Sequence, residues 1–400
     1  MRPTLLAPAY WPEVRRGTER AIRLLADGLV AEGHRPRLVC GHPGPRPTRT
    51  SEDGLDVVRL PRPIRRRLWR HRYDDHAAHL PLAVPLLVAD PGDVLHAFYP
   101  TDAVAAVTAL RVRRRVAFVL GGVPRGPRGG GASSGRPAGR SSAAGQATPP
   151  LVISVMGPPD RPWALAHRGR LEGIVDAARD AAVVTTLSRF AADRLWRTFA
   201  VRSEIVPPPV DLDAFAPGSD PGRHAEPTLL FASDPDAPAK RLGLLLDAFA
   251  RVRARRPGVR LIVQQPRTDA DRRALDALPG VRTADLDDRE VLRDAYRRAW
   301  ATVLPSENEA FGLVVAESLA CGTPAVAFAG EGPAEVITGP DVGRIASTAD
   351  AGALARAIAG ALELAVDAAT RERCRAAVGH LGVAEHARRT LDLYAAALRR

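Results

Sequence analysis

Short apolar runs recur along this chain, and a segment with helical spacing follows almost every one of them. In the first half these runs are expected to form strands at Leu5–Ala7, Arg37–Cys40, Val57–Leu60, Val94–Ala97, Val116–Val119, Val152–Val155 and Val183–Thr186. Between the first two, apolar residues at helical spacing predict a helix from Thr18 to about Ala31. Apolar strands separated by helices are typical of a parallel, doubly wound α/β sheet.

The same alternation starts again after residue 227. Strands are expected at Thr228–Phe231, Val259–Val263, Ala301–Leu304 and Ala325–Phe328, and helices at Lys240–Arg255, Arg289–Arg298, Leu313–Ala320 and roughly Ala384–Leu398. Because 400 residues are too many for one core, we expect two Rossmann-like domains, 1–206 and 228–380. A Pro-rich linker at 207–227 joins them, and a C-terminal helix occupies 381–400. Such sheets bind ligands at the carboxyl ends of their strands, which predicts a cleft between the domains.

Residues 121–150 interrupt the first series. They include nine glycines, five prolines, four arginines and no acidic residue. A segment of this composition cannot bury a core, so we expect a disordered loop. Binding of phosphate or lipid by its arginines is the alternative.

The excess of basic over acidic side chains lies in the first half of the chain. Residues 1–200 contain 31 basic and 17 acidic side chains, whereas residues 201–400 contain 26 and 28. This excess suits a nucleic-acid-binding protein, but it also suits an enzyme that faces an anionic membrane or acceptor. The run Arg62–Arg72 mixes arginines with apolar residues and could rest on anionic lipid headgroups. A solvated basic face is the simpler account.

Cysteine usage and hydropathy exclude other classes. Cys40, Cys321 and Cys374 are far apart and predict neither a disulfide framework nor a zinc site. The longest apolar run, Leu80–Ala89, is too short to span a membrane, and no signal peptide is expected before the first strand. We therefore expect a cytoplasmic protein, with a peripheral position at the inner face of the plasma membrane left open.

Lys240 is the only lysine among the 57 basic residues of the chain. Such a bias indicates a mutational pressure toward GC-rich codons, under which arginine replaces lysine wherever any positive charge is sufficient. A lysine that persists is then a candidate for a site that needs a compact ammonium group rather than a planar guanidinium. Chance survival is the alternative.

The densest candidate site is Pro305–Glu317. It places a strand end, a turn and a helix start within a few residues, and a helix start offers unpaired N–H groups to phosphate or sugar oxygens. Gly312 would let a ligand approach the backbone closely. Glu309 lies in the turn and Glu317 eight residues later, so both could face one polyhydroxylated ligand. Alternatively, Glu309 caps the helix and Glu317 is a surface residue.

The segment resembles a known family. Ser306-x-x-Glu309-x-Phe311-Gly312-Leu313-x3-Glu317, followed by Ala320-Cys321-Gly322-Thr323-Pro324, is similar to the E-x7-E signature of the family 4 retaining glycosyltransferases. Other segments resemble the same family in the correct order: Pro12–Glu19 with Gly33-His34, Val206–Pro217, and Gly332–Ile337 with Val342-Gly343. The resemblance implies the GT-B fold, two Rossmann-like domains facing each other across a cleft, with the C-terminal helix returning to the first domain.

The resemblance also implies an activity. It implies a hexosyltransferase-type enzyme that moves a sugar from a nucleotide-diphosphate donor to an acceptor hydroxyl, with retention and without a metal or other cofactor. Glu309 would contact the donor sugar, Glu317 the ribose, and Lys240 the diphosphate. Backbone amides around Phe311, Gly312 and Leu313 would hold the sugar and phosphates. Gly17 would let the N-terminal loop come near those phosphates.

Four positions depart from the family pattern, one of them in the linker, where Pro208-Pro209 replaces the common Asn-Gly. The family usually has an arginine about five residues before the lysine, but residues 233–239 contain none, so Arg241 is the candidate for a second charge. Arg16 replaces one glycine of the usual N-terminal pair and could crowd or contact a phosphate. Many relatives have a histidine after the fourth N-domain strand, where this chain has Met156–Asp160. Asp160 is therefore only an acceptor-side candidate.

Partners and alternative functions follow from the same observations. The expected partners are a nucleotide sugar and an acceptor of unknown identity, either lipid-linked or anionic, and no nucleic acid is expected. The first alternative is a sugar-nucleotide epimerase on the same scaffold, which binds a donor but needs no acceptor. The second is an Arg-rich nucleic-acid-binding protein, whose affinity would fall steeply with salt. That alternative leaves the Glu309–Glu317 segment unexplained.

Overall fold

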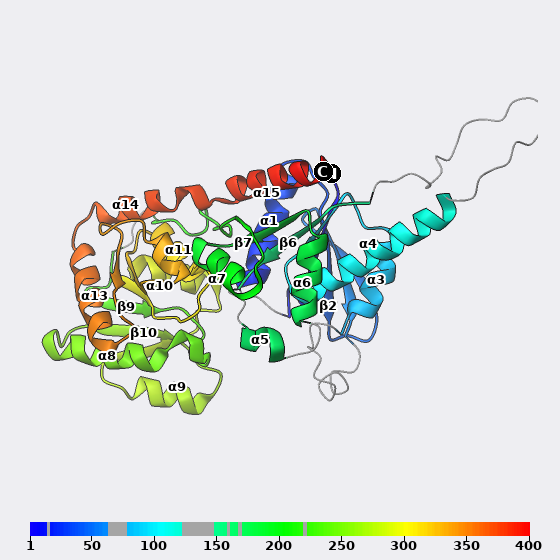
Figure 1. The fold of residues 1–400 in the computed structure, drawn as a ribbon. Helices are drawn as coiled ribbons and strands as arrows, with labels where there is room; N and C mark the ends of the chain where they lie inside the picture. The colour runs from blue at the N-terminus through cyan, green and yellow to red at the C-terminus, as the bar shows by residue number, and fades with distance from the viewer. Residues whose placement is uncertain (14–16, 63–77, 122–147, 158–160, 167–169, 219–221) are drawn as a thin grey trace, which may run out of the picture.

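The chain forms two parallel-sheet domains lying side by side, as the computed structural model in Figure 1 shows. The structure describes residues 1–13, 17–62, 78–121, 148–157, 161–166, 170–218 and 222–400. None of the helices in these ranges combines the length and apolar character needed to cross a bilayer. Cys40, Cys321 and Cys374 are buried and unpaired, as their spacing predicts.

The first domain is built on an eight-stranded sheet of order β3-β4-β2-β1-β5-β6-β7-β8. Its strands are β1 Pro3–Ala7, β2 Arg37–His42, β3 Thr48–Glu52, β4 Leu55–Pro61, β5 Val94–Ala97, β6 Leu151–Val155, β7 Val183–Thr186 and β8 Glu204–Ile205. The accompanying helices are α1 Gly17–Ala31, α3 Leu80–Ala89, α4 Pro100–Gly121, α5 Arg161–Ala166, α6 Arg170–Asp180 and α7 Arg189–Phe199. All pairings in this sheet are parallel except the edge pair β3–β4. The parallel sheet expected from the apolar runs is therefore confirmed.

The second domain repeats the plan with six parallel strands in the order β11-β10-β9-β12-β13-β14. These strands are β9 Thr228–Phe231, β10 Arg260–Gln264, β11 Val281–Ala284, β12 Ala301–Leu304, β13 Ala325–Phe328 and β14 Gly343–Ala346. Its helices are η2 Pro238–Lys240, α8 Leu242–Arg255, α9 Asp269–Asp276, α10 Arg289–Arg298, α11 Leu313–Ala320, α12 Gly332–Val336, α13 Ala351–Leu364, α14 Thr370–Ala377 and η3 Gly379–Leu381. The central strands β9, β12 and β13 are buried throughout, which explains their unbroken apolar sequences.

The last helix, α15 Val383–Leu398, returns to the first domain, where it runs beside α1 (Figure 1). Tyr394 is fully buried in the core of that domain, and its hydroxyl lies 2.7 Å from Nδ1 of His96 on β5. The return of the C-terminal helix, expected from the family resemblance, is therefore confirmed. At its start, a parallel bridge joins Gly382 to Val210 of the segment between the two sheets.

One expected strand is wrong. Residues Val116–Val119 belong to the last turns of α4, not to a strand. Strands β5 and β6 pair directly with each other, so the sheet has no place for a strand between them. Val116 is 48% exposed and Phe118 81% exposed, whereas a central strand would bury both. Likewise, the helix expected to start at Lys240 starts at Leu242, and Lys240 lies in the preceding 3-10 turn.

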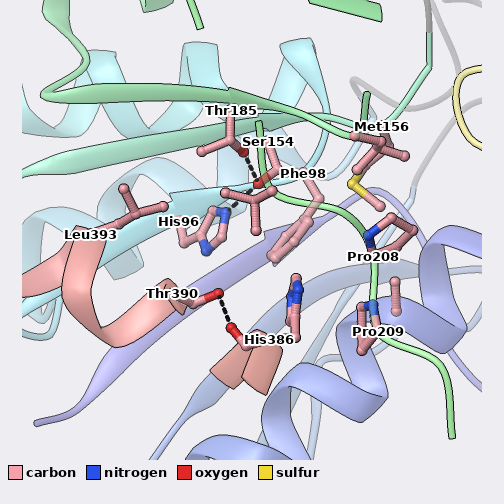
Figure 2. Close-up of a pocket in the computed structure, with 13 residues that line it drawn as sticks. His96, Phe98, Ser154, Met156, Thr185, Pro208, Pro209, His386, Thr390 and Leu393 are labelled. Carbon is pink, nitrogen blue, oxygen red and sulfur yellow. Dashed lines mark hydrogen bonds between the residues drawn. The ribbon is translucent and has the colours of Figure 1, made fainter. Parts of the chain in front are cut away.

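Two histidines face a small cavity where α15, the linker and the first sheet meet (Figure 2). His96 Nε2 lies 2.7 Å from Ser154 Oγ, and Ser154 Oγ lies 2.7 Å from Thr185 Oγ1. His386 Nδ1 lies 2.8 Å from the carbonyl oxygen of Pro207 in the linker. Loss of hydration lowers the pKa of His96 to about 3 and that of His386 to about 4.

These shifts predict a loss of stability in mild acid. Both pKa values lie below the ordinary value of 6.5, so below that pH the unfolded chain binds more protons than the folded one. The free energy of unfolding should fall between pH 7 and pH 5 by about 2 kcal/mol from His96, and by less from the partly exposed His386. Urea unfolding at several pH values would measure this. A His96→Gln variant should show a shallower pH slope, and an unchanged slope would contradict the assignment.

Candidate functional site

The sequence-predicted site lies where the strand order of the second sheet reverses. From β9 the chain winds outward through β10 and β11, and from β12 it winds the other way through β13 and β14. The loops after β9 and β12 therefore diverge from adjacent strands and leave a crevice between them, which is the usual ligand site of such sheets. The backbone N–H of Glu307 donates to the carbonyl of Ala239 at 2.8 Å, so the two loops are in direct contact.

Lys240 and Glu309 meet in this crevice. The Nζ of Lys240 donates a hydrogen bond to Oε2 of Glu309, and both side chains remain partly exposed. Beside them, Arg241 Nη2 lies 2.6 Å from Oε2 of Glu307. The backbone of Asn308 has a positive φ of 54°, a conformation that asparagine tolerates better than most residues. The only lysine and the only asparagine of the chain thus contribute to the same crevice.

The turn that carries Glu309 is fixed by its own backbone. The N–H of Glu309 donates to Oε2 of Glu331 at 2.9 Å, and its carbonyl accepts from the N–H of Gly332 at 3.0 Å. Burial raises the pKa of Glu331, although this carboxylate accepts backbone hydrogen bonds. Glu309 does not cap the following helix, because the N-cap of α11 is Gly312, with φ 87° and no side-chain cap. The capping alternative for Glu309 is therefore wrong.

Glu317 lies inside the protein and not on its surface, so the surface alternative is wrong as well. Its side chain is 6% exposed; Oε2 accepts a hydrogen bond from the Tyr296 hydroxyl at 3.0 Å, and Oε1 one from Arg20 Nη1 at 3.2 Å. Burial raises the pKa of Glu317, while the guanidinium of Arg20 acts in the opposite direction. Arg20 belongs to α1 of the first domain, so this ion pair joins the two domains beside the crevice.

The remaining predicted residues lie next to these groups. Phe311 is buried, and Leu313 starts α11. A Cβ on Gly17 would lie 3.2 Å from Cδ1 of Leu313, so the start of α1 touches the start of α11. Gly17 and Arg20 of the first domain thus lie against the start of α11 and against Glu317, which follow the turn where Glu309 contacts Lys240.

Four expectations lie outside the described residues. Arg16 and Asp160 are among them, as are residues 63–72 of the basic run and most of the loop at 121–150. Within the described ranges, no group of three or more histidine, cysteine or acidic side chains is arranged to hold a metal ion.

A second contact between the domains lies beside this site. The carboxylate of Glu335, on α12, accepts hydrogen bonds from the backbone N–H groups of Arg189 and Phe190 at 3.0 and 2.8 Å. These are the first two residues of α7 in the other domain, so Glu335 caps a helix across the interface. Arg194, on the same helix, donates to Oδ1 of Asn308 at 2.9 Å.

We expect Glu335→Ala to lower the free energy of unfolding by about 1 kcal/mol, which is the usual effect of losing a helix cap. Urea unfolding monitored by circular dichroism would measure the change. Glu372→Ala removes a carboxylate from the first turn of α14 without touching the interface and serves as the matched control. Equal losses in the two variants would show that the capping contact adds nothing.

Sequence reasoning missed Arg20, Tyr296 and Glu331. Arg20 is one arginine among many, and its partner Glu317 lies 297 residues away. Tyr296 lies on the buried face of α10 and carries no motif. Glu331 directly precedes the G-x-x-E-V-I segment, and its position next to a motif is the one signal that could have drawn attention to it.

Comparisons with known proteins show what this chain is similar to. Residues 221–378 match the family described as "Glycosyl transferases group 1". Two curated relatives are both named D-inositol 3-phosphate glycosyltransferase. The one from Xylanimonas cellulosilytica is 35% identical over 56% of this chain and 59% of its own length. The one from Geodermatophilus obscurus is 37% identical over 32% of this chain and 33% of its own length. The matches thus span between a third and three fifths of these relatives.

Solved structures are similar over nearly the whole chain. Sucrose-phosphate synthase from Thermosynechococcus elongatus has a TM-score of 0.70 at 20% identity, covering 98% of both chains. HepE from Anabaena, in complex with UDP and glucose, has a TM-score of 0.67 at 15% identity, covering 98% of this chain and 99% of its own. At these identities the likeness concerns the fold. The fold of the chain is GT-B, as the motifs predict.

Proposed function

We propose that this chain, whose residues 221–378 match the family described as "Glycosyl transferases group 1", moves a sugar from a nucleotide-diphosphate donor to an acceptor hydroxyl. We further propose that the transfer retains the anomeric configuration, concerns a hexose and needs no metal ion. One observation carries the proposal. The sole lysine contacts Glu309 at the reversal point of the second sheet, inside the matched region. Two charges of opposite sign there suit a ligand that has both phosphates and hydroxyls.

The donor would exchange partners with this pair. When a diphosphate binds, the ammonium of Lys240 turns to it, and the carboxylate of Glu309 is released to accept hydrogen bonds from sugar hydroxyls. Arg241 can leave the partly exposed Glu307 and add a second positive charge. The backbone N–H groups at the start of α11 face the same ligand, and the positive φ of Gly312, 87°, with close packing of Pro333 against it, fixes where that helix starts. Glu317 would bind the ribose through Oε1, in competition with Arg20.

The chemistry then depends on the leaving group. The bond between the anomeric carbon and the diphosphate oxygen breaks, and a bond from the acceptor oxygen forms on the same face of the sugar. The hydroxyl proton passes to the departing phosphate oxygen, so charge is balanced. Negative charge develops on the diphosphate in the transition state, and groups already aimed at it lower the barrier. In this chain Lys240, Arg241 and the N-terminus of α11 provide those groups.

A thermal-shift titration tests the donor site. Purified protein is titrated with UDP, GDP, ADP, dTDP and CDP in the presence of a chelator. A ligand that binds only the folded state at 100 times its dissociation constant stabilises it by about 2.7 kcal/mol. We expect one nucleotide to raise the melting temperature, and the identity of that nucleotide gives the base of the donor. If none of the five does so, the proposed donor site is wrong.

Product analysis separates transfer from epimerisation. With the donor of the identified base and no acceptor, an epimerase would convert one nucleotide sugar into another, whereas a transferase would leave the donor intact apart from slow hydrolysis. Repeating the assay with and without chelator tests the proposed independence of metal ions.

A further inference from the structure

A sizeable cavity lies in the first domain, not in the crevice that holds Lys240. Its volume is about 340 Å³. Apolar side chains from α4, β6, α6, β7 and α7, and from the residues directly after β5 and β6, line it, among them Phe98, Ile153, Met156, Ile174, Val184 and Leu195. Its few polar lining groups come from Thr18, Tyr99 and Ser154, and no charged side chain of the described ranges lines it. Protein interiors rarely leave a void of this size unoccupied, and cavities of 300 Å³ or more with apolar walls are typical of ligand sites.

The cavity is lined mainly by β6, β7, α6 and α7, and it reaches the point where the strand order of the first sheet reverses, between β1 and β5. From β1 the chain winds outward through β2 and β4, and from β5 it winds the other way through β6 and β7. Thr18, at the start of α1, and Phe98, directly after β5, both line the cavity. The cavity therefore extends from β6 and β7 to the reversal point of the first sheet, which is the counterpart of the place that the Lys240 crevice occupies in the second.

One end of the cavity adjoins the donor crevice. Thr18 lines it, and the neighbouring Gly17 lies against Leu313 at the start of α11. Met156, also in its lining, packs against the core of the first domain and against the cluster that joins Leu187 and Ala191 of that domain to the core of the second. An acceptor seated here would thus present its outer end to the site where the donor sugar is expected.

The inner end of the cavity does not need a polar ligand, because its polar group already has hydrogen-bond partners. Figure 2 shows Phe98, Ser154 and Met156, which line both this cavity and the smaller one beside His386. The Ser154 hydroxyl already lies 2.7 Å from His96 Nε2 and 2.7 Å from Thr185 Oγ1. An anionic group would lose its hydration here without gaining a cation from the described residues.

We infer that this cavity binds the hydrocarbon chain of a hydroxyl-bearing acceptor, with the hydroxyl at the Thr18 end. The inference rests on the proposed function, since it assigns the acceptor class of the same enzyme. A cavity of about 150 Å³ with apolar walls suffices to bind benzene, so 340 Å³ has room for about twelve carbon atoms. Of the two acceptor classes that the sequence leaves open, the lining selects a lipid-like one.

Binding of straight-chain alcohols tests the inference without any nucleotide. Calorimetric titration with 1-butanol, 1-hexanol, 1-octanol and 1-decanol should give a dissociation constant that falls roughly fourfold per added methylene. Ala177, on α6, is 1% exposed and lines the cavity, so Ala177→Leu should fill part of it. That variant should remain folded with a lowered melting temperature, because Ala177 also packs in the core, and should lose the dependence of affinity on chain length for the longer alcohols. Ala270→Leu, at an exposed position of α9, is the matched control and should behave as the wild type.

A second variant acts in the opposite direction. Ile174→Ala enlarges the cavity, so the chain length beyond which affinity stops rising should increase. The inference would be overturned if the affinity of the wild type for the alcohols did not change with their chain length. It would also be overturned if a folded Ala177→Leu showed the same dependence of affinity on chain length as the wild type. If a nucleotide raises the melting temperature while the alcohols fail to bind, this inference falls and the donor site stands. If no nucleotide raises the melting temperature either, the proposed donor site is wrong as well, on the evidence of the thermal-shift titration alone.

Discussion

Replacing Lys240 by alanine should reduce sugar transfer by about 100- to 1,000-fold and remove the stabilisation of the protein by its nucleotide. Loss of one preorganised group that stabilises developing charge typically has an effect of this size on the rate. The variant also leaves the Glu309 carboxylate without its cation, next to the expected position of the diphosphate. Steady-state kinetics and nucleotide-dependent melting would measure both effects.

The same variant should remain folded. The Lys240–Glu309 pair is partly exposed, and pairs of this kind contribute about 1 kcal/mol or less to the free energy of unfolding. Melting of the free protein should therefore change little, which separates loss of binding from loss of structure. Arg256→Ala removes an exposed cation that pairs with Glu363, and this control should leave both transfer and nucleotide binding unchanged.

Lys240→Arg tests why a lysine stands at this position. The guanidinium keeps the charge but is planar and larger, so it cannot occupy the place of a compact ammonium between Glu309 and a phosphate. We expect it to recover no more than about a tenth of the wild-type rate. Full recovery would show that charge alone is required and that the survival of this lysine was chance.

Replacing Gly332 by alanine should disrupt the turn that carries Glu309. A Cβ at Gly332 would overlap the carbonyl oxygen of Ala310 and lie 2.7 Å from that of Glu309. Both obstacles are backbone atoms, so the turn itself must move, and overpacking of this kind lowers the free energy of unfolding by about 3 kcal/mol. Displacement of Glu309 should also weaken the binding of the donor sugar, which appears as a raised KM for the nucleotide sugar.

Gly243→Ala is the matched control, because no atom lies within 4 Å of the Cβ position in this first turn of α8. It should be neutral or stabilise the helix by up to about 1 kcal/mol, as alanine favours helix over glycine. Urea unfolding of the two variants would give the comparison. If Gly332→Ala were as stable and as active as Gly243→Ala, close backbone approach would not be the reason for glycine in this motif.

Most of the fold could be predicted from local pattern, because the central strands of both sheets are buried on both faces and read as apolar runs. The failures have a physical cause. Val116–Val119 has the composition of a strand, but the helix that starts at Pro100 continues through it and leaves Phe118 exposed. The edge strand Thr48–Glu52 was missed because it is largely exposed and polar, so no apolar run marks it.

The candidate site was predictable where the signal is local and was missed where it is not. The turn with Glu309 and the lone lysine stand out in the sequence. The burial of Glu317 does not, because it depends on Tyr296 and on Arg20, which lies 297 residues earlier in the chain. A carboxylate on a helix is ordinarily expected to face water, and contacts across a domain interface carry no periodicity.

The return of α15 has a consequence for how the protein is made. Tyr394 fills the core of the first domain and contacts His96, 298 residues earlier in the chain. At a synthesis rate of about 5 to 20 residues per second, a ribosome needs roughly 15 to 60 s to cover that separation. Throughout this interval the nascent first domain lacks the tyrosine that fills its core. We therefore expect its core to be completed only after the second domain has been synthesised, so that the first domain made is the last to mature.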